Sequence, residues 1–336
     1  GSGQAVELDK PKVAVELDSS PVTLDTTEDP ILYGSKDKET FSGVAESKQD
    51  PNIVTNDIID EPHPSQESKD DDSAEEKIDE QKSEDEAKDS SRTGDKLSYD
   101  KLIKLNREEM LKYIGIDLNN LTSIDNDSLS KIPDEIFDKA EVLPMFPDKV
   151  MRYKESIEKA GKNINISPNV LAILMTIESK GDPMAKSPAP AYGLLQITKI
   201  AMEQLTILEH NNSLYDPNAL IDWQKMVDKI NRKESLTQAE IDRHIELAAK
   251  YLKFCYQTAS TKIEEAIESG SLDKNSFVEA LETVNAAGGY NGGPMGIFKS
   301  FDSMPSEARK YMKMTAKGVY LLVLNLANEQ NATLYI

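Results

Sequence analysis

Apolar residues recur at three- and four-residue intervals along most of the chain after residue 97, the pattern of one buried helix face. The spacing predicts packing helices over residues 99–116, 127–143 and 147–161. Pro133 and Pro147 lie near expected helix starts, where the missing N–H of proline is tolerated. The chain from residue 98 onward is therefore predicted to be mainly helical.

The most informative pattern covers residues 167–179. Ser167 is the expected N-cap and Pro168 the first helical residue, and apolar side chains then line almost every side of the helix up to Glu178. Burial raises the pKa of a carboxyl, and a protonated carboxyl can act as a general acid toward a glycosidic oxygen. Position alone leaves a second interpretation open, a glutamate that leaves the helix into solvent.

Charge divides the chain into two regimes. Residues 1–97 contain 27 acidic and 11 basic side chains, so −16 of the total formal charge of −21 lies there. Such a segment cannot bury enough apolar surface to fold, which predicts a disordered acidic tether. An alternative is an acidic docking arm for a basic protein partner. The opening Gly1–Gly3 is typical of a tag remnant, so a native signal sequence is not expected to be visible.

Several classes of protein are disfavoured by what the chain contains. The longest apolar run, Val319–Ala327, is far short of the roughly 20 residues that cross a bilayer, so no transmembrane segment is expected. Cys255 is the only cysteine and is predicted to be a small core residue, and the three histidines are scattered, so no metal or cofactor is expected. The acidic balance argues against nucleic acid as a partner.

The stretch after Glu178 resembles the soluble lytic transglycosylase domain, a relative of goose-type lysozyme. The family pattern is Glu-Ser, five variable residues, Ala-x-Ser, then Gly-Leu-Met-Gln-Ile. Without a gap, its places are held here by Glu178, Ser179, Ala185, Ser187, Gly193, Leu194, Leu195, Gln196 and Ile197. The resemblance implies a mainly α, lysozyme-like catalytic domain of the α+β superfamily, preceded by the disordered acidic N-terminal region.

Further blocks occur in the order of the family. Asp216–Pro217 resembles its Asp-Pro, residues 244–252 its Asn-Ile-x-x-Gly-x-x-Tyr-Leu, residues 290–294 its Ala-Tyr-Asn-Ala-Gly-Pro, and residues 307–314 its closing Glu-Thr-x-x-Tyr-Val helix. The chain is therefore divided into an acidic tether at 1–97, a helical linker or small subdomain at 98–147, a lytic transglycosylase-like catalytic domain at 148–318, and an apolar segment at 319–336 that packs on the domain.

Three features depart from the family pattern. Gly181 stands where relatives commonly carry an aromatic residue, and Pro190 stands where they have glycine, which changes the path expected for the loop. Leu195 replaces methionine and conserves volume. Residues 218–243 are longer than the usual connection and predict an inserted helical hairpin beside the cleft.

The resemblance implies a peptidoglycan lytic transglycosylase, a carbon–oxygen lyase with a single acid/base glutamate. It would cleave the bond between N-acetylmuramic acid and N-acetylglucosamine and leave a 1,6-anhydro end. Its partner would be the glycan strands of peptidoglycan, in the periplasm or cell envelope or from a bacteriophage virion. The residues carried over are Glu178 as the catalytic group and, for substrate binding, Ser179, Ser187, Gln196, Tyr290 and Asn291.

Two alternatives remain open at this point. The first is a hydrolytic muramidase on the same fold, in which Asp182 or Asp216 positions a water molecule. The second is a glycan-binding or assembly module with little turnover, which the altered loop around Pro190 would favour.

Overall fold

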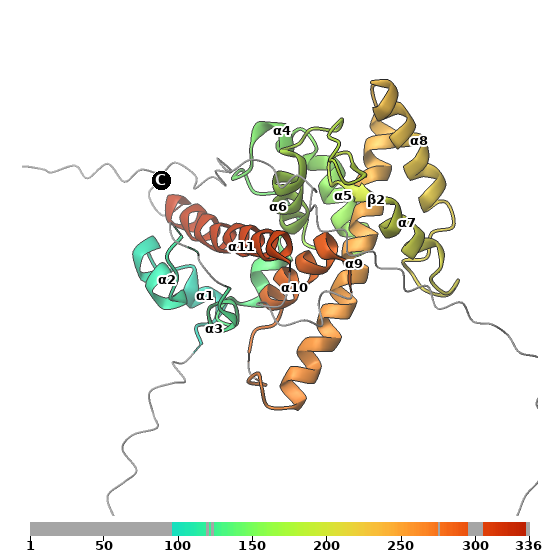
Figure 1. Cartoon of the computed structure of the whole chain (residues 1–336). Helices are drawn as coiled ribbons and strands as arrows, with labels where there is room; N and C mark the ends of the chain where they lie inside the picture. Colours follow the sequence, from blue (N-terminus) through green and yellow to red (C-terminus); the bar gives the residue numbers. More distant parts are fainter. Residues whose placement is uncertain (1–95, 119–120, 122–123, 275, 295–304, 334–336) are drawn as a thin grey trace, which may run out of the picture. The chain divides into compact units, whose positions relative to one another are not determined.

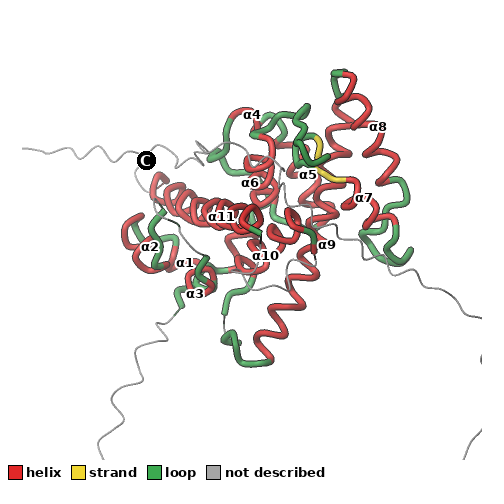
Figure 2. Tube along the Cα trace, in the orientation of Figure 1, coloured by secondary structure: helices red, strands yellow, loops and turns green. Residues whose placement is uncertain are grey.

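The computed structural model of the chain describes residues 96–118, 121, 124–274, 276–294 and 305–333. The predictions on the acidic tether before residue 96 lie outside the described residues. In the described part, helices predominate and two short strands form the sheet (Figure 2). The prediction of a mainly α fold is thus confirmed.

The elements follow one another along the chain as shown in Figure 1. The helices and strands are α1 (Tyr99–Leu102), α2 (Arg107–Ile114), α3 (Asn126–Leu129), the 3-10 helix η1 (Asp134–Asp138), α4 (Asp148–Met151), α5 (Lys154–Ile164), α6 (Pro168–Ser179), β1 (Ala191–Tyr192), β2 (Ile197–Thr198), α7 (Lys199–Thr206), α8 (Ala219–Arg232), α9 (Gln238–Glu268), α10 (Glu279–Gly292) and α11 (Ser306–Thr333).

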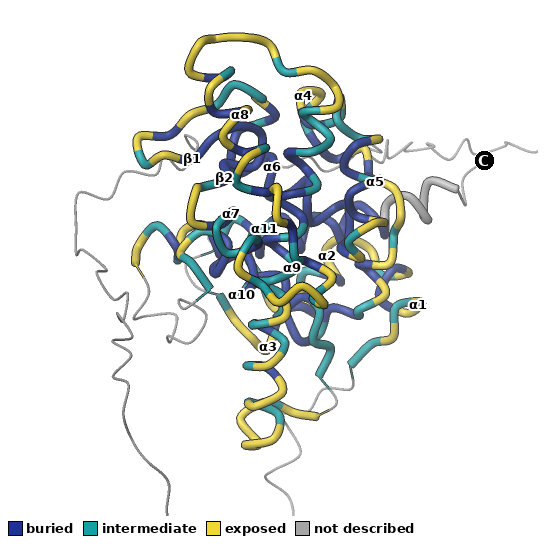
Figure 3. The backbone as a smooth tube through the Cα atoms, turned by 90° about the vertical axis from the view of Figure 1, so that its right-hand side faces the viewer, coloured by how far each residue is buried: buried dark blue, intermediate teal, exposed yellow. Residues whose placement is uncertain are grey.

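Helix α6 is buried along its whole length. All twelve of its residues are buried, and Figure 3 shows the buried backbone there. It contacts α4, α5 and α11. Gly318 allows α11 to approach closely, because a Cβ at that position would lie 2.7 Å from Cγ2 of Ile173. The apolar surface on every side of α6 is therefore explained by neighbours on several sides.

Residues 98–147 belong to the same hydrophobic core as the later helices. Their buried side chains, such as Leu102, Met110 and Phe137, join one continuous cluster with those of α6, α9 and α11. The helix predicted over 99–116 is divided, because Asn106 forms a capping box with Glu109 and starts a new helix. The segment 127–143 is likewise only partly helical, as α3 and η1.

The hairpin predicted over 218–243 is present as α8 and the first turns of α9, which lie side by side (Figure 1). Lys233 ends α8 in the left-handed conformation, and Thr237 starts α9 with a capping box to Glu240. Cys255, on α9, is fully buried, as expected of a core residue.

Helix α11 continues without a break through residue 319, where the sequence suggested a separate terminal segment. Its apolar run Val319–Ala327 is buried, and so is the polar Asn325 within it, which donates to the carbonyl of Leu321. None of the described helices combines the length and the apolar character needed to cross a membrane.

Candidate active site

Glu178 lies in the last turn of α6, at a point where the chain reverses sharply. Lys180 ends the helix in the left-handed conformation with φ 54°, and its N–H donates to the carbonyl of Thr176. Gly181 follows with φ 79°. Two consecutive residues in this region of backbone space lead the chain away from the helix axis, so the loop after Ser179 returns toward the end of α6.

Gly181 is required by close packing as well as by its φ angle. A Cβ there would lie 2.6 Å from the carbonyl carbon and oxygen of Lys149 and 2.9 Å from the nitrogen of Val150, all backbone atoms of α4. An aromatic side chain, which relatives commonly carry at this position, has no room. This departure from the family pattern therefore has a local physical cause.

Replacing Gly181 with alanine is expected to lower the free energy of unfolding by about 3 kcal/mol, the combined effect of left-handed strain and overpacking against backbone. Gly270→Ala is the matched control, since Gly270 has φ 73° and a Cβ at that position would have no atom within 4 Å. Urea unfolding at neutral pH measures both. Equal losses in the two variants would contradict the packing contribution.

The Glu178 carboxyl is buried and weakly partnered. The residue is 3% exposed, and neither carboxyl oxygen has a hydrogen-bond partner in the described structure. Burial raises the pKa of Glu178 to about 8, while the nearby Tyr311 hydroxyl on α11 acts to lower it. The two groups are therefore close, although they do not reach full hydrogen-bond geometry. At neutral pH Glu178 carries a proton that it can donate.

Ser179 links the end of α6 to the turn between the two strands. Its hydroxyl donates to the carbonyl of Leu194 at 2.7 Å and accepts from the N–H of Gly181 at 3.2 Å. These bonds engage the hydroxyl within the protein. A direct contact of Ser179 with substrate stays a prediction, whereas its part in joining helix and turn is visible.

Gln196 occupies a strained position in the same turn. Its φ is 47°, which is uncommon for a residue with a side chain, and the residue is 4% exposed. The side-chain Nε2 donates to the carbonyls of Gly193 at 2.9 Å and Ala185 at 3.2 Å. The amide group is therefore held in one orientation, and its role in substrate binding stays a prediction.

Ser187 lies in the loop that leads to β1. Its hydroxyl donates to the carbonyl of Ala189, and its N–H donates to the carbonyl of Ala191 at 3.1 Å. The loop containing Pro190 is thus closed by bonds on both sides of the proline. A role for Ser187 in substrate binding remains a prediction.

Tyr290 and Asn291 belong to the last turn of α10, so the Tyr-Asn-Gly-Gly segment ends a helix. The Tyr290 hydroxyl donates to the carbonyl of Leu195 at 2.8 Å, and its ring lies 5.5 Å from that of Tyr251. The Asn291 side-chain nitrogen is buried and has no partner in the described part of the chain. Tyr290 therefore hydrogen-bonds to the same turn that contains Gln196 and that Ser179 also contacts.

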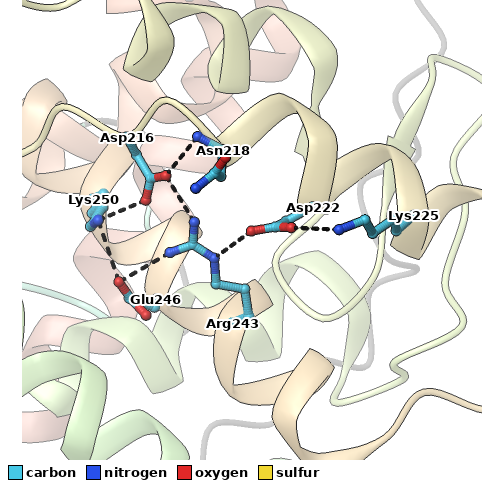
Figure 4. A network of polar contacts seen from close by, with 7 residues as sticks. All are labelled: Asp216, Asn218, Asp222, Lys225, Arg243, Glu246 and Lys250. Atoms are coloured by element: carbon cyan, nitrogen blue, oxygen red, sulfur yellow. Dashed lines mark hydrogen bonds and ion pairs between the residues drawn. The ribbon is translucent and has the colours of Figure 1, made fainter.

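Asp216 lies in a charged network outside this turn (Figure 4). Its carboxylate accepts from Arg243 and from Lys250, both at 2.8 Å, and from the N–H of Asn218 at 3.2 Å. Burial acts to raise the pKa of Asp216, but the bonds from Arg243 and Lys250 outweigh it and hold the pKa below its usual value. Asp216 therefore joins the start of α8 to α9.

Asp216→Asn is expected to lower the free energy of unfolding by about 2 kcal/mol at pH 7, because Arg243 and Lys250 both lose their buried anionic partner and keep only the more exposed Glu246 in common. The effect is reduced from that of a fully buried pair, since the Arg243 side chain is 26% exposed. Asp222→Asn, which removes a more exposed partner of Arg243, is the control and is expected to cost less. Urea unfolding compares them, and equal costs would contradict a structural role specific to Asp216.

Asp182 is placed differently. It is exposed, and its carboxylate accepts from the N–H of Met184 at 2.9 Å in the loop after α6.

No three His, Cys, Asp or Glu side chains in the described ranges are grouped so that they could hold a metal ion. In the part of the chain that the structure describes, Glu178 lines neither a cavity of about 640 Å³ beside Phe137 and Glu279 nor one of about 320 Å³ beside Trp223 and His244.

Two residues of the candidate site were missed by sequence reasoning: Tyr311 near Glu178 and His244 at the turn. Tyr311 lies within the segment noted for its resemblance to the closing helix, and that segment was the signal that pointed to it. His244 is 3% exposed, and its Nε2 accepts from the N–H of Leu195 at 3.1 Å. The signal for it in the sequence was that it is the first residue of the segment 244–252, which resembles the Asn-Ile-x-x-Gly-x-x-Tyr-Leu motif.

The comparisons with known proteins agree with this arrangement. A search of curated proteins found no match. The family model described as the transglycosylase SLT domain matches residues 155–313, a range that contains α6, both strands, α10 and Tyr311. The helix that carries Glu178 and the turn that Ser179 joins to it thus lie within the matched range, and residues 155–313 of the chain match the transglycosylase SLT domain.

Proposed function

We propose that the protein is a peptidoglycan lytic transglycosylase in which Glu178 acts alone as acid and base. The SLT domain supports activity of this type at the level of the family. The observation that carries the proposal is the buried Glu178 carboxyl, with its pKa raised to about 8, on a helix end that Ser179 joins to the 193–196 turn. A group in this state can donate a proton at neutral pH.

The proposed reaction consumes no water. Protonated Glu178 donates its proton to the oxygen between N-acetylmuramic acid and N-acetylglucosamine, and the bond from that oxygen to C1 of the muramic acid breaks. The C6 hydroxyl oxygen of the same sugar then bonds to C1, and its proton passes to the Glu178 carboxylate. One product has a free C4 hydroxyl, the other has a 1,6-anhydro ring, and Glu178 is protonated again.

The geometry favours this scheme over hydrolysis with a second carboxylate. Ordinary glycosidases use two carboxyl groups, one as acid and one as nucleophile or base. Two aspartates were considered for that second role. The carboxylate of Asp216 accepts hydrogen bonds from Arg243 and Lys250. Asp182 is exposed, and its carboxylate accepts from the N–H of Met184. Neither is a buried carboxylate beside Glu178.

Product analysis tests the proposal. Purified peptidoglycan is incubated with the full chain, and the soluble muropeptides are separated and weighed by mass spectrometry. We expect ends that are one water lighter than those released by a hydrolytic muramidase from the same material. Predominantly hydrated, reducing ends would assign the chain to hydrolysis, and no soluble product with retained binding to the sacculus would assign it to binding alone.

A further inference from the structure

Side chains from three helices hold the backbone of the turn that carries Gln196. Trp223 on α8 donates from Nε1 to the carbonyl of Ile197 at 3.0 Å, and Tyr290 on α10 donates to the carbonyl of Leu195 at 2.8 Å. His244 on α9 accepts from the N–H of Leu195 at 3.1 Å. The backbone on both sides of Gln196 is thus fixed by groups that are distant in sequence.

His244 differs from the other two because it must act as an acceptor. Since Nε2 receives the N–H of Leu195, that nitrogen is unprotonated and the ring proton resides on Nδ1, which is buried without a partner in the described structure. A buried backbone N–H without an acceptor costs free energy. The conformation of the turn is therefore stabilised by His244 Nε2, which accepts the N–H of Leu195.

The ring also determines the shape of the turn. Gly193 has φ 77°, and a Cβ built there would lie 2.8 Å from Cε1 and 2.9 Å from Nε2 of His244. The imidazole of His244 therefore packs directly on Gly193, the first residue of the turn. The same ring accepts the hydrogen bond from the N–H of Leu195, the residue before Gln196. No other side chain among the described residues both packs on Gly193 at this distance and hydrogen-bonds to Leu195 N–H.

We infer that His244 is a positioning residue for the proposed reaction: through Gly193 and Leu195 it holds Gln196 in the left-handed conformation that presents its amide to the glycan. This inference rests on the proposed function. The turn is linked to Glu178 through the adjacent Ser179, which donates to the carbonyl of Leu194 in the same turn. Loosening the turn displaces the substrate relative to the acid, and displacements of about 1 Å cost on the order of 100-fold in rate.

The test compares His244→Phe, which keeps a planar ring without an acceptor, with His244→Gln, which supplies an amide oxygen. On soluble glycan strands we expect the phenylalanine variant to lose about 100-fold in kcat/KM, with a raised KM as well as a lowered kcat. The glutamine variant is expected to recover most of the loss. A variant that is only partly folded would lower the apparent kcat and leave KM unchanged.

Leu252→Ala is the matched control, since Leu252 is fully buried two turns further along α9 and takes no part in the turn. It should destabilise the protein without changing KM. In parallel, NMR of the imidazole nitrogens in the wild type should show an unprotonated Nε2, and amide hydrogen exchange at Leu195 should be slow and become fast in His244→Phe.

The outcomes separate the two proposals. A wild type that releases no fragments refutes the proposed function and catalytic positioning together, while slow exchange at Leu195 would still show the structural contact. An active wild type whose phenylalanine variant has an unchanged KM, or loses no more kcat/KM than Leu252→Ala, refutes the positioning role alone. A protonated Nε2 in the wild type also refutes it.

Discussion

Glu178→Gln is expected to reduce the release of soluble muropeptides from purified peptidoglycan by at least about 1,000-fold. Glutamine has nearly the shape of a protonated glutamic acid, but its amide cannot donate a proton to the glycosidic oxygen or take one from the C6 hydroxyl. General acid–base catalysis by one group contributes about 10²- to 10⁴-fold, and here one group performs both transfers. The rate of fragment release and co-sedimentation with the sacculus measure turnover and binding separately.

Glu279→Gln is the matched control for this substitution. Desolvation and the nearby Asp134, Asp138 and Glu282 raise the pKa of Glu279 to about 7, so it is another glutamate with a raised pKa, although its side chain is only half-buried. It lines the cavity of about 640 Å³, which Glu178 does not line. We expect it to retain activity. Release of fragments by Glu178→Gln at the wild-type rate would show that the acid lies elsewhere.

Helix α6 could be predicted from the sequence almost to the residue. A proline such as Pro168 is tolerated only in the first turn of a helix, so it predicts where α6 starts. The apolar residues that follow predict that the helix is buried on every side. The end was readable from the residue types after Glu178. Ser167 occupies the N-cap position as predicted, although its hydroxyl makes no capping bond.

The partners of the candidate site could not be derived from helical periodicity. Tyr311 has the spacing of an ordinary core residue, and only the contact between α11 and α6 places its hydroxyl near a carboxyl. The bonds of Ser179 and Gln196 depend on the path of the loop back to α6, which two left-handed residues determine. Such tertiary arrangements leave little trace in the local pattern, except through the resemblance to a family.

The contribution of Glu178 to the stability of the wild type is expected to fall as pH rises from about 4.5 to about 8. Its carboxyl has an ordinary pKa of 4.5 and is raised by burial to about 8, so the folded state holds a proton that the unfolded state releases in this interval. Each pH unit in that window removes about 1.4 kcal/mol, on the order of 5 kcal/mol over the full window. The contribution is fully present below pH 4.5 and is lost as pH rises through the folded pKa.

Urea unfolding of the wild type and Glu178→Gln at about pH 5.5 and about pH 8.5 measures this effect. The variant is neutral at both values, so its advantage over the wild type should grow by about 3 kcal/mol between them. The comparison cancels the similar slope from Glu279, which both proteins share. A constant difference between the two proteins would show that the Glu178 carboxyl ionises in the folded state near its ordinary pKa, and the protonated acid on which the reaction depends would be absent at neutral pH.

His244 should act in the opposite direction, which gives an internal check. Burial lowers the pKa of His244 from 6.5 to about 3. Between these pH values the imidazole is protonated in the unfolded state but not in the folded state. Its contribution is present above pH 6.5 and is lost as pH falls. As pH falls from about 6.5 to about 4.5, the stability of His244→Gln relative to that of the wild type should therefore rise by about 2 to 3 kcal/mol. An unchanged acid slope would mean that the folded protein protonates His244, and a protonated ring cannot accept the N–H of Leu195.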